Sequence, residues 1–192
     1  MRSLFSIQKT AERIEEGIEE RMKLSVNSNV QLRTIDHENA DLLFPLLKED
    51  LKEISQWFSI EEDYKLEYEH EYVEEKAPPY DEAFVIYYNG EPCGRVGLYD
   101  YDQSKDEIFL YYWVAHQYRR KHIAIDSILS VMDYLGSLGL KKVLFDVKRG
   151  NEYSIALINH LPGAVLREEK EDFLIYCCPL RSRTQEDGKY PE

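Results

Sequence analysis

The sequence has few cysteines and no long apolar run, and each absence excludes a class of protein. Its three cysteines, Cys93, Cys177 and Cys178, are an odd number without the spacing of a disulfide framework, which favours a reduced, intracellular protein. No apolar run reaches the length of a membrane span, and charged residues follow soon after Ile7. We therefore expect no signal peptide, no membrane association and a cytoplasmic location.

Basic charge is also scarce. The chain carries 37 acidic and 24 basic residues, a formal net charge of −13, whereas a general nucleic-acid-binding protein needs a basic surface. An acidic surface attracts cationic amines, although it can equally serve solubility alone. The 43% hydrophobic and 12% aromatic shares argue against disorder and allow a full core.

The hydrophobic pattern predicts one domain over 27–180, with a helical extension over 1–26 and a polar tail over 181–192. The dipeptide Asn89–Gly90 predicts a tight hairpin. The expected helices are 6–23, 36–47, 51–58, 60–75, 123–138 and 151–161, and the expected strands are 30–34, 83–88, 93–101, 107–114, 142–147, 164–167 and 173–178. Asp36 is the expected N-cap of the second helix. This order of elements is typical of a mixed α/β sheet without internal repeats.

Three consecutive cations, Arg119, Arg120 and Lys121, stand where a helix is expected to begin after strand 107–114. Cations are unfavourable there because the helix macrodipole is positive at its N-terminus. In so acidic a chain this placement indicates an anion-binding site, since helix N-termini bind phosphates through free N–H groups. The alternative is a solvated basic turn that pairs with nearby glutamates.

The segment 111–124 resembles the coenzyme A pyrophosphate loop of the GNAT acyltransferases, in the form Gln/Arg-X-X-Gly-X-Gly/Ala. Arg119 matches its first position and Ala124 its last, whereas His122 replaces the usual glycine and Arg120 a frequent one. The resemblance implies that the pyrophosphate binds along Arg119, Arg120, Lys121, His122, Ile123 and Ala124. Glycine lets the backbone approach a ligand closely, so the His122 side chain must either point away from the phosphates or contact them.

Two further segments resemble the same family. Tyr112–Val114 is similar to the strand that runs beside the pantetheine arm, which implies that Trp113 and Val114 contact the cofactor and that the Val114 N–H stabilises the oxyanion. Asn151 and Ser154 fit the family's Asn-X-X-Ala/Ser-Ile helix, in which the asparagine helps to hold the cofactor, although Asn151 is also a good N-cap. Ser154 and the segment 22–33 resemble the subgroup that acetylates the N-termini of ribosomal proteins.

The resemblance covers about 22–179 and implies a fold and a cofactor. The fold is a mixed, mostly antiparallel sheet of about seven strands flanked by helices, and the cofactor is acetyl-coenzyme A, used as cosubstrate without a metal.

The sequence also contains candidates for the catalytic acid and the catalytic base. Ile158 stands where many family members have a tyrosine acid, so Ser154 or a water would assist the leaving thiolate. Glu107 is the first candidate for the base because it shares strand parity with Phe109 and Tyr111, although most carboxylates in an acidic chain only solvate the surface. The other candidates are Asp106, Glu82, His116 in a turn and His160, which can instead cap its helix.

The leading interpretation is an N-acetyltransferase in which an amine, from a protein N-terminus or a small cationic molecule, attacks the thioester directly in a ternary complex. The alternatives are a degenerate domain that binds acyl-coenzyme A without turnover, and an interaction protein that uses the acidic stretch 61–75. The sequence leaves the oligomeric state open between a monomer and a homodimer.

Overall fold

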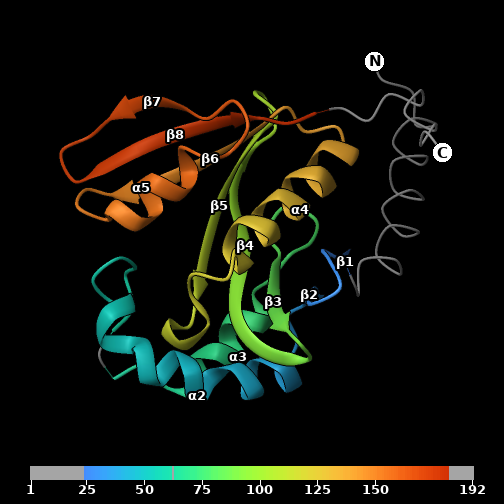
Figure 1. Cartoon of the computed structure of the whole chain (residues 1–192), viewed down its shortest axis with the longest axis vertical. Coiled ribbons are helices and arrows are strands. Elements are labelled where there is room, and N and C mark those ends of the chain that lie inside the picture. Colours follow the sequence, from blue (N-terminus) through green and yellow to red (C-terminus); the bar gives the residue numbers. More distant parts are fainter. Residues whose placement is uncertain (1–23, 62, 182–192) are drawn as a thin grey trace.

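The computed structural model describes residues 24–61 and 63–181, and there it shows one eight-stranded sheet with the order β1-β2-β3-β4-β5-β6-β8-β7 (Figure 1). The strands are β1 (Leu24–Ser25), β2 (Val30–Thr34), β3 (Ala83–Tyr88), β4 (Glu91–Asp102), β5 (Glu107–Val114), β6 (Lys142–Lys148), β7 (Val165–Glu169) and β8 (Phe173–Pro179). The helices are α2 (His37–Ile54), α3 (Leu66–Glu74), α4 (Ile123–Ser137) and α5 (Glu152–Ile158), with a 3₁₀ turn, η1, at His116–Tyr118. Within these residues every strand pair is antiparallel except β5–β6.

The mixed α/β sheet expected from the sequence is confirmed, and it has one more strand than predicted. The short β1 pairs with β2, so the sheet begins inside the segment assigned to the N-terminal extension. The expected helix at 6–23 lies outside the described residues, as does the tail beyond residue 181. The hairpin at Asn89–Gly90 is confirmed, because both residues adopt positive φ (54° and 87°) between β3 and β4.

The helices before β3 differ from the prediction. The two helices expected at 36–47 and 51–58 are the single helix α2, which continues through Pro45 because its buried stripe, with Leu43, Leu47 and Leu51, is continuous. The helix expected at 60–75 is confined to α3. The N-cap is as predicted: the Asp36 carboxylate accepts a hydrogen bond from the Asn39 N–H at 2.8 Å, and the Asn39 side chain accepts one from the Asp36 N–H.

The sheet separates two hydrophobic cores. Alternate residues of β5, including Ile108, Leu110 and Val114, pack on the face covered by α4 and α5. Trp113 packs on the opposite face with Leu47 of α2. We call these the α4/α5 face and the α2/α3 face. None of the helices within 24–61 and 63–181 combines the length and the apolar character of a membrane span.

The parallel strands β5 and β6 are joined at one end only. Their registered pairs run from Glu107–Lys142 to Phe109–Leu144, whereas β6 stays paired with β8 as far as Lys148. We call the paired part, residues 107–109 and 142–144, the closed end. The remaining residues, 110–114 and 145–148, form the open end, where the sheet is split.

Candidate active site between two separating strands

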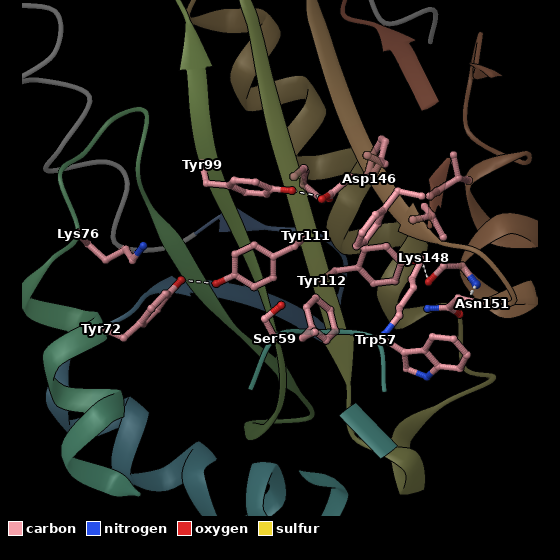
Figure 2. A pocket seen from close by; sticks show the side chains of 17 residues that line it. Trp57, Ser59, Tyr72, Lys76, Tyr99, Tyr111, Tyr112, Asp146, Lys148 and Asn151 are labelled. Atoms are coloured by element: carbon pink, nitrogen blue, oxygen red, sulfur yellow. Dashed lines mark hydrogen bonds between the residues drawn. The ribbon is translucent and has the colours of Figure 1, made fainter. Parts of the chain in front are cut away.

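A pocket of about 380 Å³ occupies the open end and reaches both faces of the sheet. From the α2/α3 face it is lined by Tyr72, Tyr99 and Tyr111 (Figure 2), and from the α4/α5 face by Tyr112 and Ser154. Residues from β6 and the segment after α2 complete the lining: Phe145, Asp146, Val147, Lys148, Trp57, Phe58 and Ser59. Because it passes through the sheet, the pocket can admit two molecules from opposite sides.

The backbone of β5 is directed into the split. The Ala115 N–H donates to the Cys93 carbonyl at 2.9 Å, so Gly94 and Val114 form a pair without mutual hydrogen bonds. The N–H and C=O of Val114 therefore point away from β4, towards the side that β6 leaves at the open end. This orientation suits the oxyanion role predicted for the Val114 N–H. The Trp113 side chain, by contrast, is buried in the core against α2.

Arg119, the first residue of the predicted loop, is engaged with α2. Its Nε donates to the Val114 carbonyl at 2.9 Å, and its guanidinium pairs with Glu53 at 2.5 Å and lies 3.7 Å from buried Asp50. These bonds join the loop to α2 and fix the end of β5. For Arg119 the structure thus agrees with the alternative of a cation paired with a glutamate, although this glutamate is distant along the chain.

Arg120 and Lys121 are exposed at the start of α4. The Lys121 Nζ lies 5.2 Å from the ring centre of Tyr88 and 5.3 Å from that of Tyr118, and such contacts hold an ammonium group near aromatic faces. These two cations, rather than Arg119, are placed to meet an anion at the helix start.

The two residues that replace family glycines both adopt a left-handed backbone. Arg120 and His122 have φ of 61°, a conformation that glycine adopts without steric cost. His122 is the N-cap of α4 and makes no side-chain capping bond. The N–H of Asp126 donates to the His122 carbonyl at 3.0 Å, so the N–H groups of buried Ile123 and half-buried Ala124 precede the first intrahelical bond. Such groups bind phosphates at helix N-termini.

The α5 side of the pocket contains a pair of hydroxyl groups. The side-chain oxygen of Asn151, Oδ1, accepts a hydrogen bond from the Ser154 N–H at 3.2 Å, so Asn151 caps α5 as its N-cap role predicts. The Tyr112 hydroxyl donates to Ser154 Oγ at 3.2 Å. Burial raises the pKa of Tyr112 to about 12, so its phenol stays protonated at neutral pH. Ile158 is buried beside them and supplies only apolar wall.

On the α2/α3 face, a buried network fixes the tyrosines. Glu69 of α3 and Arg95 of β4 form a buried ion pair, and the hydroxyls of Tyr72 and Tyr111 are hydrogen-bonded to each other (Figure 2). A Cβ at Gly97 would lie 2.4 Å from the Tyr111 ring, so only glycine leaves that ring its place. Burial raises the pKa of Tyr72 and of Tyr111, which keeps both phenols neutral. Sequence analysis missed this network.

Among the residues that the structure describes, the carboxylate that lines the pocket is Asp146, which sequence analysis also missed. It accepts a hydrogen bond from the Tyr99 hydroxyl, and its side chain is exposed. The signal was present in the alternation of β6: Phe145 and Val147 are core residues, which turns Asp146 to the other face.

Glu107 lies at the closed end and does not line the pocket. Its buried carboxylate accepts hydrogen bonds from Lys142 Nζ at 2.8 Å and Arg167 at 2.7 Å. Burial alone would raise the pKa of Glu107, but these two bonds hold it below its ordinary value. Glu107 lies in β5 on the face that it shares with Tyr111, as its strand parity predicted, but its position at the closed end argues against Glu107 as the base.

The other candidates for the base also lie away from the pocket lining. Asp106 pairs with Lys141 at 2.6 Å, and buried Glu82 accepts a hydrogen bond from Thr34 at 3.4 Å. His116 contacts buried Asp50 at 2.6 Å, and the His160 ring bonds the Ala156 carbonyl at 2.7 Å, as expected for a residue that caps its helix. Within 24–61 and 63–181 no group of His, Cys, Asp and Glu is arranged to hold a metal ion.

Comparisons with known proteins agree with this geometry. Residues 45–161 match the model of the acetyltransferase (GNAT) family. No curated protein sequence matches the chain. The fold is similar to that of apo RimL, a ribosomal L7/L12 α-N-protein acetyltransferase, with a TM-score of 0.73 and 14% identity over 82% of this chain and 94% of that one.

Two further solved structures are similar. The microcin C7 self-immunity acetyltransferase MccE, in complex with acetyl-CoA and AMP, has a TM-score of 0.71 and 16% identity over 83% of this chain and 97% of that one. Mycobacterium smegmatis RimJ, in complex with a CoA disulfide, has a TM-score of 0.67 and 17% identity over 78% of this chain and 81% of that one. At these identities the likeness concerns the fold.

Proposed function

The chain belongs to the GNAT family of acetyltransferases, and from this membership we propose that it transfers the acetyl group of acetyl-coenzyme A to a primary amine within a ternary complex. The observation that carries the proposal is the pocket at the open end, which crosses the sheet and presents different chemistry on its two faces. Backbone groups and hydroxyls lie towards α4 and α5, and phenols with a carboxylate lie towards α2 and α3.

The α4/α5 face suits the cosubstrate. The start of α4, with Arg120 and Lys121 beside it, would hold the pyrophosphate, and the Val114 N–H would stabilise the thioester oxygen as it gains negative charge. Trp113 and Asn151 would act indirectly, since the one anchors β5 in the core and the other caps α5. The cosubstrate supplies the activated acetyl group, and the protein supplies position and charge stabilisation.

Ser154 and Tyr112 would assist the departing thiolate. The Ser154 hydroxyl accepts from the protonated Tyr112 phenol, so its own proton is free to point into the pocket. A thiol with a pKa of about 8.5 is a fair leaving group, so modest help from a hydroxyl or water is enough.

We propose a protein N-terminus as the acceptor rather than a polycationic amine. Although the whole chain carries −13, the charged residues that line the pocket are Lys76, Lys148 and Asp146, two cations and one anion among the described residues. A polyamine would meet this local positive charge. An α-amine has a pKa of about 8, against about 10.4 for a lysine-like amine, and so is more often neutral at physiological pH. Several similar structures are acetyltransferases of ribosomal-protein N-termini.

The test offers acetyl-coenzyme A with a panel of acceptors and measures thiol release together with acceptor mass. The panel contains peptides with free N-termini, the same peptides blocked at the N-terminus, a polyamine and an amino sugar. We expect acetylation of the free peptides and none of the blocked ones. Cofactor binding by calorimetry without turnover on any amine would instead identify a degenerate binding module. Faster turnover of the polyamine than of the peptides would overturn the choice of acceptor.

A further inference from the structure

Asp146 is the one carboxylate among the described residues that line the pocket. It lies in β6 at the open end, and its side chain is exposed. Its neighbours Phe145 and Val147 are buried in the core against α4 and α5. Asp146 therefore points to the α2/α3 face, the side opposite the start of α4 and Ser154. A group on this side meets the acceptor rather than the cosubstrate.

One hydrogen bond fixes the carboxylate. The Tyr99 hydroxyl of β4 reaches across to Asp146 Oδ1, and Figure 2 shows the two side chains meeting over the pocket. Among the described residues Tyr99 is the sole hydrogen-bond donor to Asp146, so the second oxygen, Oδ2, keeps its lone pairs for a ligand or a water. Burial and the bond to Asp146 raise the pKa of Tyr99, so this phenol remains a donor at physiological pH.

Resting on the proposed acetyl transfer, we propose that Asp146 is the catalytic base that accepts the proton of the attacking amine, directly or through one water, and that Tyr99 is the positioning residue that holds its carboxylate. The amine nitrogen forms a bond to the thioester carbon, and the carbon–sulfur bond breaks with its electron pair on sulfur. Before this attack the proton of the substrate ammonium passes to Asp146, which leaves a neutral amine; after it the nitrogen loses a second proton and the thiolate gains one, through the Ser154 hydroxyl or a water. Asp146 then returns its proton to solvent.

The surroundings of Asp146 suit this role. Its titratable and charged neighbours in the pocket are Tyr99 of β4, Tyr111 of β5, Lys148 of β6, Tyr72 of α3, and Lys76 in the following turn. Lys76 is paired with Asp81 at 2.6 Å and covers the Tyr72 ring at 4.0 Å, so its charge is partly offset. The phenols are neutral hydrogen-bonding groups, and Lys148 lies two residues along β6 on the same face as Asp146.

The test compares Asp146→Asn, Tyr99→Phe and the matched control Asp106→Asn, which removes a carboxylate outside the pocket. Each is assayed for kcat and KM with an acetylated peptide N-terminus as product, for coenzyme A affinity by calorimetry, and for melting. We expect Asp146→Asn to lower kcat by about 10²-fold or more, within the range for general base catalysis, with unchanged cofactor affinity and melting. The control should match the wild type.

The pH profile distinguishes a base from a structural residue. The deficit of Asp146→Asn should shrink as the pH rises, because an amine that is already neutral needs no base. Tyr99→Phe should lower kcat by about tenfold with the same shrinking deficit, since it loosens the carboxylate without removing it. A wild type that acetylates amines and an equally active, folded Asp146→Asn would overturn this assignment alone. A wild type without turnover on any amine would overturn the proposed function and this assignment together.

Discussion

The closed and open ends of the β5–β6 pair are built from the same two strands, but they place a carboxylate in opposite surroundings. At the closed end Glu107 is buried and accepts bonds from two cations, Lys142 and Arg167. At the open end Asp146 is exposed in a pocket and accepts a bond from one phenol, Tyr99. The separation of the strands, rather than the residue type, decides which carboxylate can reach a substrate.

The largest effect on stability is expected at the closed end. Glu107→Gln removes the charge that both cations face, and loss of hydrogen bonds between charged groups costs about 1–3 kcal/mol. Both cations are partly exposed, so water reduces the loss towards the lower value. We expect a lower free energy of unfolding in urea and unchanged turnover per folded molecule. A large loss of kcat in a stable variant would restore Glu107 as the base and break the comparison.

The same variant should show a characteristic dependence on pH. The two cations hold the folded-state pKa of Glu107 below its ordinary value. A depressed pKa contributes stability above the ordinary pKa of about 4.3, and this contribution is lost as the pH falls through the folded-state value. The difference in unfolding free energy between wild type and Glu107→Gln should therefore have its full size at pH 7 and disappear in acid. A constant difference would mean that the variant acts through packing.

The two strands and the faces of their residues were predictable from the sequence, but the point at which the strands separate was not. Periodicity correctly predicted β5, β6 and the face that Glu107 shares with Tyr111, because these depend on neighbouring residues. The point at which β5 separates from β6 depends on contacts between segments that are far apart in the chain. Strand parity therefore identified the face on which Glu107 lies, but not whether it lies at the closed or the open end. Asp146 was overlooked because its apolar neighbours Phe145 and Val147 indicate a core strand, whereas the pocket on its other face depends on where β5 and β6 separate.

The loop shows the same limit. The three cations were correctly placed at the start of α4, and Arg120 and Lys121 are exposed there. Arg119 could not be separated from them by sequence, because its partners Asp50 and Glu53 lie in α2. A charge near a helix start is visible in the sequence, whereas the group that neutralises it is fixed by the fold.

A smaller loss of kcat is expected for Ser154→Ala, on the α5 side of the pocket. If the Ser154 hydroxyl supplies the proton to the thiolate, kcat should fall by about tenfold, the lower part of the effects of proton transfer, with cofactor affinity unchanged. Stability should change by no more than about 1 kcal/mol, because one hydrogen bond to Tyr112 is lost. Steady-state kinetics and melting measure both. Tyr112→Phe is the matched control, because it keeps the Ser154 hydroxyl and removes only the phenol that donates to it. An unchanged kcat in both variants would mean that water protonates the thiolate.

The smallest effect is expected for His122→Gly, at the loop of the open end. His122 has a φ of 61°, so glycine removes a steric cost of about 1 kcal/mol, but it also gives the unfolded chain more freedom, which costs about as much. Melting should therefore change little.

Cofactor affinity in His122→Gly should stay equal or rise, because the exposed imidazole makes no capping bond and glycine lets the backbone approach the phosphates closely. Asp106→Gly, next to the closed end, is the matched control, since Asp106 has a similar φ of 52° and lies outside the pocket. It tests the same backbone change without the site. Calorimetry measures the affinity of both variants for coenzyme A. A tenfold loss of affinity in His122→Gly alone, with the fold intact, would show that the imidazole itself contacts the phosphates. The loop would then hold its anion with a side chain in place of the backbone approach that glycine gives to the family.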